Sequence, residues 1–89
     1  MEFIYEKSRI FMKDADGTVI AEITFPITDG VATIDHTFVD GSLRGQGVAG
    51  KLVTATANAI RACGLKAMPT CSYAAKWFAD RPEQQDILI

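Results

Sequence analysis

The sequence lacks most of the features that mark specialised classes of protein. None of its apolar runs approaches the roughly 20 residues that a membrane-spanning helix needs. It has no block of basic residues, and nine Lys and Arg against eleven Asp and Glu give a net charge of −2. We therefore expect neither a membrane partner nor the extended positive surface that binds nucleic acid.

Targeting segments and metal-binding motifs are missing as well. The start Met-Glu-Phe-Ile has neither the cationic region nor the apolar stretch of a secretory signal, so we expect a cytoplasmic protein. The two cysteines, Cys63 and Cys71, are eight positions apart and form no CxxC pair. This spacing excludes zinc and thioredoxin-like motifs, predicts no metal site and leaves two free thiols.

Length and composition limit the architecture. A chain of 89 residues can bury one small core and has no room for a second, so a single domain over residues 1–89 is expected. The hydrophobic content of 48% and charged content of 22% are ordinary for a globular protein. Disorder of the whole chain is therefore excluded.

The first forty residues have the pattern of strands separated by turns. Asp16-Gly17 and Asp29-Gly30 are typical hairpin turns, and residues 18–27 between them alternate apolar and polar side chains. Pro26 closes that strand, and residues 31–39 form the next β-rich run. The pattern predicts an antiparallel meander of three or four strands.

After this meander the apolar period becomes helical. Apolar residues recur at helical spacing from Val48 to Cys63, which places Cys63 in the predicted core, and Gly64 ends the helix. A short strand over residues 65–68 and a second helix over 72–80 follow, with Tyr73, Trp77 and Phe78 predicted to pack on the sheet. The fold class is therefore α+β, with the last strand parallel to residues 31–39.

The chemically informative segment is the glycine-rich loop between the meander and the main helix. Unpaired amides at a helix N-terminus attract anions, and Gly45 and Gly47 let a phosphate approach the backbone closely. Arg44 and Lys51 add positive charge on either side. Gly45, Gly47 and Gly50 also match a dinucleotide fingerprint, but the preceding meander is antiparallel and the ribose-binding acid is missing.

Residues 44–49, Arg-Gly-Gln-Gly-Val-Ala, resemble the Arg/Gln-x-x-Gly-x-Gly/Ala signature of the GNAT acetyltransferase superfamily. His36-Thr37, Pro69-Thr70-Cys71 and Pro82-Glu83 extend the similarity to its short single-domain members. The resemblance implies a GNAT-like fold and acetyl-CoA as cofactor, with the loop amides holding the pyrophosphate. The cofactor-binding residues it implies are Arg44, Gly45, Gln46, Gly47, Val48, Ala49, Gly50 and Lys51.

Cys71 and His36 are the candidate catalytic residues. Cys71 is predicted at the start of the final helix, where a thiolate could accept the acetyl group; the alternative is a small buried hydrophobe. His36, the single histidine, is a candidate general base or else a hydrogen-bonded structural residue. Larger members of the superfamily place a proton-donating Tyr seven residues after the position of Cys71, where this chain has Phe78.

These features predict an N-acetyltransferase that uses acetyl-CoA to acetylate an unidentified amine, either directly or through Cys71. A coenzyme A-binding or interaction module without catalysis is the alternative, favoured by Phe78. Because the length leaves out a substrate domain, the acceptor site is expected to be shallow or completed by a partner subunit. The sequence leaves open whether the chain forms a homodimer.

Overall fold

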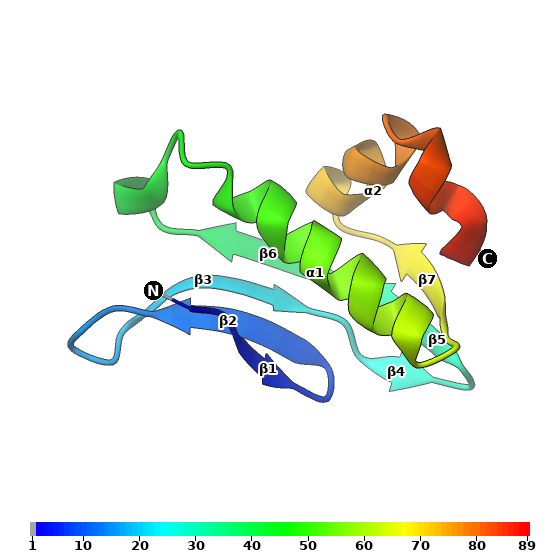
Figure 1. Ribbon diagram of the computed structural model, residues 1–89, viewed down its shortest axis with the longest axis horizontal. Coiled ribbons are helices and arrows are strands. Elements are labelled where there is room, and N and C mark those ends of the chain that lie inside the picture. Colours follow the sequence, from blue (N-terminus) through cyan, green and yellow to red (C-terminus); the bar gives the residue numbers. More distant parts are fainter. Residues whose placement is uncertain (1) are drawn as a thin grey trace.

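The computed structural model describes residues 2–89. Six short strands precede the main helix, which is followed by one strand and a second helix (Figure 1). The strands before the main helix are β1 (Ile4–Glu6), β2 (Arg9–Lys13), β3 (Val19–Thr24), β4 (Ile27–Thr28), β5 (Val31–Ile34) and β6 (His36–Val39). The later elements are the 3-10 helix η1 (Gly41–Leu43), α1 (Val48–Ala62), β7 (Lys66–Pro69), α2 (Ser72–Ala79) and the 3-10 helix η2 (Pro82–Ile87).

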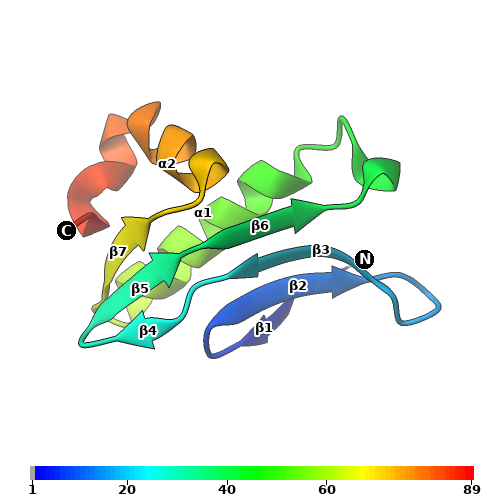
Figure 2. The same ribbon diagram turned by 180° about the vertical axis from the view of Figure 1, so that it is seen from behind.

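The strands form two sheets. One has the order β1-β2-β3-β6 and is antiparallel throughout; the other has the order β4-β5-β7. Within the second sheet β5 and β7 are parallel, with Ala32 opposite Ala67. Seen from behind, the strands lie in front of α1, which covers one face of both sheets (Figure 2). The predicted α+β fold, with a meander, a main helix, a parallel strand and a short C-terminal helix, is confirmed.

The two predicted hairpin turns are present. In the first, the Asp14 carboxylate accepts hydrogen bonds from the amides of Asp16 and Thr18, each at 2.9 Å. The predicted strand over residues 18–27 is interrupted before Pro26, so that β3 ends at Thr24 and β4 begins at Ile27. Proline interrupts it because it has no amide hydrogen to donate to a neighbouring strand.

Residues 31–39 form two strands instead of the single predicted one. The break is at Asp35, which belongs to neither strand. Before it, β5 pairs with β4 and β7; after it, β6 pairs with β3 alone. The break also changes which side chains face the core, because Ile34 is fully buried whereas His36 is exposed. The predicted parallel pairing is thus confirmed for the first half of this segment only.

The hydrophobic core lies between the sheets and one face of α1. The helix contributes Val48, Leu52, Val53, Ala57 and Ile60, and strands β2, β3 and β5 contribute among others Ile10, Ile23 and Ile34. The prediction that Cys63 belongs to this core is wrong, because it caps the C-terminus of α1 and is exposed. The described residues contain no helix long and apolar enough to cross a membrane.

Candidate functional site

The loop after β6 leads into an uncapped helix N-terminus. Asp40 caps the short helix η1 by accepting the Ser42 amide at 2.9 Å. Hydrogen bonds from Ser42, through its side chain first and then its amide, hold the pKa of Asp40 below its usual value. Gly47 occupies the N-cap position of α1 in the left-handed conformation, with φ at 69°, and has no side chain to accept a hydrogen bond from the helix.

The amides of the first turn of α1 are therefore free. The first hydrogen bond at this end runs from the Lys51 amide to the Gly47 carbonyl at 3.1 Å. The amides of Val48, Ala49 and Gly50 therefore have no acceptor within residues 2–89. The first turn also carries no acidic residue. Free amides together with the positive end of the helix dipole make this terminus suited to a phosphate.

A cavity of about 320 Å³ is lined by Val48, Ala49 and Gly50, the residues that carry these amides. Its walls include six of the eight residues predicted to bind the cofactor: Arg44, Gly45, Gly47, Val48, Ala49 and Gly50. A Cβ added at Gly45 or Gly47 would meet no atom within 4 Å, so the space in front of both glycines is open. Both glycines have positive φ, a conformation that other residues rarely adopt.

The other two predicted cofactor-binding residues lie elsewhere. Gln46 and Lys51 line a second cavity of similar size, together with Phe3, Met12 and Leu43. Val48, at the start of the helix, borders both cavities. The structure thus brings Arg44 to the glycine loop and places Lys51 on the other side of the helix start.

Cys71 lies where the two sheets separate. It is half-buried and caps the N-terminus of α2, where its sulfur accepts the Ala74 amide at 3.3 Å. The hydroxyl of Thr37, on β6, is 3.4 Å from the same sulfur. The Cys71 amide donates to the Ile34 carbonyl at 3.1 Å, which fixes the backbone of this residue against the end of β5.

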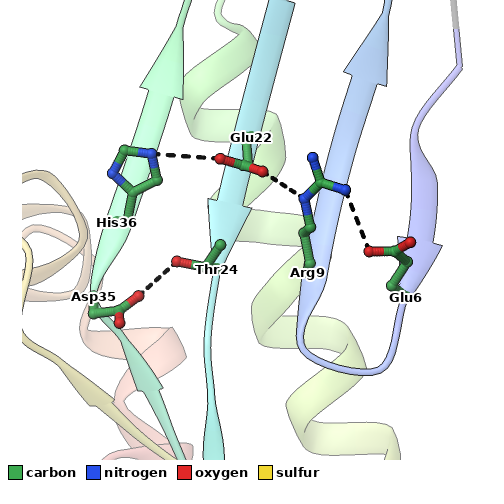
Figure 3. A network of polar contacts seen from close by, with 6 residues as sticks. All are labelled: Glu6, Arg9, Glu22, Thr24, Asp35 and His36. Carbon is green, nitrogen blue, oxygen red and sulfur yellow. Dashed lines mark hydrogen bonds and ion pairs between the residues drawn. The ribbon is translucent and has the colours of Figure 1, made fainter. Parts of the chain in front are cut away.

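His36 belongs to a different face of the sheet. Successive side chains of a strand point to opposite faces, and the contact of Thr37 with Cys71 therefore directs His36 away from that sulfur. Its Nε2 lies 3.5 Å from Glu22 Oε1, and its side chain is 53% exposed. Figure 3 shows His36, Glu22 and Arg9 in a row across neighbouring strands. The structure does not bring His36 and Cys71 together.

That row continues to the edge of the sheet. Arg9 contacts Glu22 on one side and Glu6 on the other, the latter at 3.3 Å (Figure 3). The hydrogen bond to Glu22 is the main reason that the pKa of Arg9 is raised. The row thus links side chains of β1, β2, β3 and β6 across one face of a sheet whose register is set by backbone pairing.

Tyr73 is a functional candidate that the sequence interpretation missed. Predicted to pack on the sheet, it is instead 44% exposed and lines the cavity over the glycine loop. Trp77 and Phe78 do pack in the core, with their rings edge to face and centroids 4.9 Å apart. The position of Tyr73 in the sequence could have indicated this, because it lies in the first turn of the helix that follows Cys71.

Residues 2–89 contain no cluster of three or more His, Cys, Asp or Glu that could hold a metal ion. The cavity over the glycine loop is lined by the residues with free amides, by Arg44 and by Tyr73, whereas Cys71 is not among its lining residues. The amides and the guanidinium can bind an anionic ligand, and the phenol can donate a proton.

The sequence and the fold are similar to those of known proteins. A family model described as GCN5-related N-acetyl-transferase matches residues 9–87. The solution structure of a GCN5-like protein from Staphylococcus aureus is 31% identical, with a TM-score of 0.81 over 99% of this chain and 87% of its own. Among curated proteins, a sequence search finds no match.

More distant structures share the fold. An acetyltransferase from Bacillus cereus is 19% identical, with a TM-score of 0.66 over 91% of this chain and 56% of its own. The N-acetylglutamate synthase of Neisseria gonorrhoeae, solved with coenzyme A and N-acetylglutamate, is 16% identical, with a TM-score of 0.65. That match covers 83% of this chain but only 18% of the synthase. This chain is thus much shorter than most of the enzymes it resembles.

Proposed function

The chain belongs to the family of GCN5-related N-acetyltransferases, and on this premise we propose that it binds acetyl-CoA and transfers the acetyl group to an amine. The observation that carries the proposal is the uncapped start of α1, where the amides of Val48, Ala49 and Gly50 border an open cavity. A pyrophosphate carries the charge and the acceptor oxygens that such amides need.

The residues of the cavity fit this ligand. Gly45 and Gly47 leave the backbone accessible, since an added Cβ at either would stand in open space. Arg44 supplies a guanidinium on the wall of the same cavity. Because the protein as a whole carries a net charge of −2, attraction of the anionic cofactor must come from this local arrangement.

Acetyl-CoA supplies an acetyl group activated as a thioester. In the route through Cys71, its thiolate forms a bond to the acetyl carbon as the bond from that carbon to the coenzyme A sulfur breaks. The amine then forms its bond to the same carbon, the bond to Cys71 breaks, and the amine proton passes to water. In the direct route, the amine itself forms the bond to the acetyl carbon as the bond from that carbon to the coenzyme A sulfur breaks.

Tyr73 is proposed to protonate the departing coenzyme A thiolate. Its phenol lines the cavity that holds the loop amides, whereas Phe78, which has no proton to donate, is buried in the core. Tyr73 would regain its proton from water, to which 44% of its surface is exposed. General acids of this kind accelerate reactions by roughly a hundredfold or more.

The acceptor is proposed to be an amine that approaches from solvent or from a partner subunit. The chain spans little more than half the length of the Bacillus cereus enzyme. A second copy of the chain could complete the acceptor site. We propose the cytoplasm as the location of this activity.

A coenzyme A-binding module without catalysis is the second candidate. It is favoured by one observation: the single histidine, the obvious general base, faces Glu22 on the opposite side of β6 from Cys71. In that case the loop would still bind coenzyme A or its thioesters, and the chain would report their level to a partner.

Acetyl-CoA titration, followed by incubation with a panel of primary amines and mass spectrometry, distinguishes these functions. Binding together with acetylated amine supports the transferase. An acetyl adduct that disappears in Cys71→Ser, together with loss of amine acetylation, supports the route through Cys71; full transfer in Cys71→Ser supports the direct route. Binding without transfer supports the module, and absence of binding contradicts both proposals.

A further inference from the structure

Arginines without an acidic partner line two neighbouring cavities. The sequence has four arginines, and two of them, Arg9 and Arg61, form ion pairs with acidic side chains. The other two, Arg44 and Arg81, form no ion pair within residues 2–89. Arg44 lines the cavity over the glycine loop, and Arg81 lines a cavity of about 490 Å³ beside α2. We call the second one the α2 cavity.

The two cavities adjoin at Tyr73, which lines both. The other walls of the α2 cavity are Ser72, Lys76, Trp77, Asp80 and Arg81. Within α2 these positions recur every three to four residues, so they follow one face of the helix away from Tyr73. A ligand that occupies the cavity over the glycine loop can therefore extend past Tyr73 into the α2 cavity.

The guanidinium of Arg81 is held in place by Trp77. It lies over the indole ring, 4.7 Å from the centroid, and its Nη1 donates a hydrogen bond to the Trp77 carbonyl at 3.2 Å. An arginine fixed in this way loses little further freedom when it binds an anion. Lys76 and Asp80 pair with each other at 2.9 Å, so their charges offset and the positive charge of Arg81 is left without a counter-charge in this cavity.

We propose that the α2 cavity binds the 3′-phosphate of coenzyme A and that Arg81 is its cationic partner. Coenzyme A carries a pyrophosphate and a phosphate monoester on the same ribose, so its two anionic groups lie only a few bonds apart. The loop amides and Arg44 suit the pyrophosphate, and a second cation is then needed just beyond the loop. The inference rests on the proposed binding of acetyl-CoA and deepens it, because it makes the protein selective for ligands that carry this phosphate.

Lys51 is the alternative cation, since it is also free of ion pairs within residues 2–89. It lines the cavity on the other side of the helix start, whose walls are otherwise mostly apolar, with Phe3, Met12 and Leu43 among them. Within the same residues no hydrogen bond holds its ammonium in place. An apolar cavity with one unrestrained lysine suits a phosphate less well than the fixed guanidinium of Arg81.

The test compares the Kd of coenzyme A with the Kd of 3′-dephospho-coenzyme A, measured by calorimetry. The two ligands differ in one phosphate, so the ratio of their Kd values cancels any effect of a substitution on the fold or on the loop. Arg81→Gln removes the proposed partner, and Lys51→Gln removes the alternative one. Arg61→Gln is the matched control, because it makes the same change at an arginine that lines neither cavity.

We expect wild type to bind coenzyme A about tenfold more tightly than the dephospho form, the size expected for one hydrogen-bonded contact between charged groups. In Arg81→Gln the two Kd values should become equal through weaker binding of coenzyme A alone. Lys51→Gln and Arg61→Gln should keep the wild-type ratio. Equal Kd values in wild type, a ratio that persists in Arg81→Gln, or a ratio lost in Lys51→Gln would overturn the proposal.

A measurement on wild type keeps the proposal testable if circular dichroism shows that Arg81→Gln does not fold. Two-dimensional NMR spectra of the complexes with the two ligands should differ most at the amides of Lys76 and Arg81. Identical shifts at these amides would overturn the proposal.

Failure of this inference and failure of the proposed function give different results. If both ligands bind equally well, the glycine loop remains the proposed coenzyme A site and the role of Arg81 alone is contradicted. If neither ligand binds, the proposed function is contradicted and this inference with it.

Discussion

The hydroxyl of Tyr73 lies 3.6 Å from the point where a Cβ on Gly50 would stand. The first turns of α1 and α2 therefore meet at one place, and both residues line the cavity over the glycine loop. The helix that follows Cys71 thus begins beside the helix whose free amides suit a phosphate.

Gly50→Ala is expected to stabilise the protein. Gly50 lies in the first turn of α1, and alanine is favoured over glycine in helices by up to about 0.5–1 kcal/mol. A separation of 3.6 Å is an ordinary van der Waals contact, so Tyr73 does not need to move. Urea unfolding should show a free energy of unfolding higher by that amount; a loss of stability would mean that Tyr73 cannot accommodate the methyl group.

Gly47→Ala is expected to weaken acetyl-CoA binding, and Gly64→Ala is its matched control. Both glycines have φ of 69° and an open space around an added Cβ, so both variants should lose about 1–2 kcal/mol of stability through backbone strain. Only Gly47 borders the loop cavity. Calorimetry should show at least about a tenfold increase in Kd for Gly47→Ala, because a methyl group would keep the pyrophosphate from the amides.

The control decides how that result is interpreted. If Gly64→Ala loses as much affinity for acetyl-CoA as Gly47→Ala, the effect is one of general destabilisation. If Gly47→Ala binds acetyl-CoA as tightly as wild type, the loop is not part of the binding site.

The features that the sequence predicts correctly are those set by interactions between residues close together in the chain. The alternation in residues 18–27 and the helical spacing after Val48 predict strands and a helix, because each pattern reflects one face turned to the core. The glycine loop was also predictable, since the need for positive φ at Gly47 is a property of the loop itself.

The remaining features depend on contacts between distant segments. The break at Asp35 arises because β5 pairs with β7 while β6 pairs with β3, and nothing in residues 31–39 alone indicates two partners. Cys63 has the spacing of the apolar helix face, but the helix ends one residue earlier and leaves it exposed. Tyr73 reaches Gly50 only through the packing of α2 against α1.

Tyr73→Phe is expected to slow acetyl transfer while leaving acetyl-CoA binding intact. The substitution removes the proposed proton donor and keeps the ring, so the rate of transfer should fall about a hundredfold with Kd unchanged. Tyr5→Phe is a suitable control, because Tyr5 is 62% exposed on β1 and does not line the loop cavity. If Tyr73→Phe transfers acetyl groups at the wild-type rate, water and not Tyr73 protonates the departing coenzyme A thiolate.

The ion pair between Arg61 and Asp86 is expected to make stability depend on pH. It joins the last turn of α1 to η2, with nitrogen–oxygen distances of 3.0 and 2.8 Å. The hydrogen bond from Arg61 lowers the pKa of Asp86 below its ordinary value of 3.8. A carboxyl whose pKa is lower in the folded state adds stability above that ordinary value, and this contribution disappears as the pH falls through the folded pKa.

Asp86→Asn should therefore unfold more easily than wild type at pH 7, and the difference should narrow below pH 3.8. Asp16→Asn makes the same change of charge in the hairpin turn between β2 and β3 and is the control variant. Urea unfolding at a series of pH values measures both. A difference between Asp86→Asn and wild type that is constant with pH would mean that the ion pair adds nothing to stability.

The most direct test of the proposed acetyl-CoA site follows the backbone amides by two-dimensional NMR as acetyl-CoA is added. We predict that the largest changes in chemical shift occur at the amides of Gly45, Gly47, Val48, Ala49 and Gly50, with smaller ones at the start of α2. The hairpin between β2 and β3 should remain unchanged. Saturation without changes at these five amides, or changes centred on another surface, would contradict the assignment of the loop as the acetyl-CoA site.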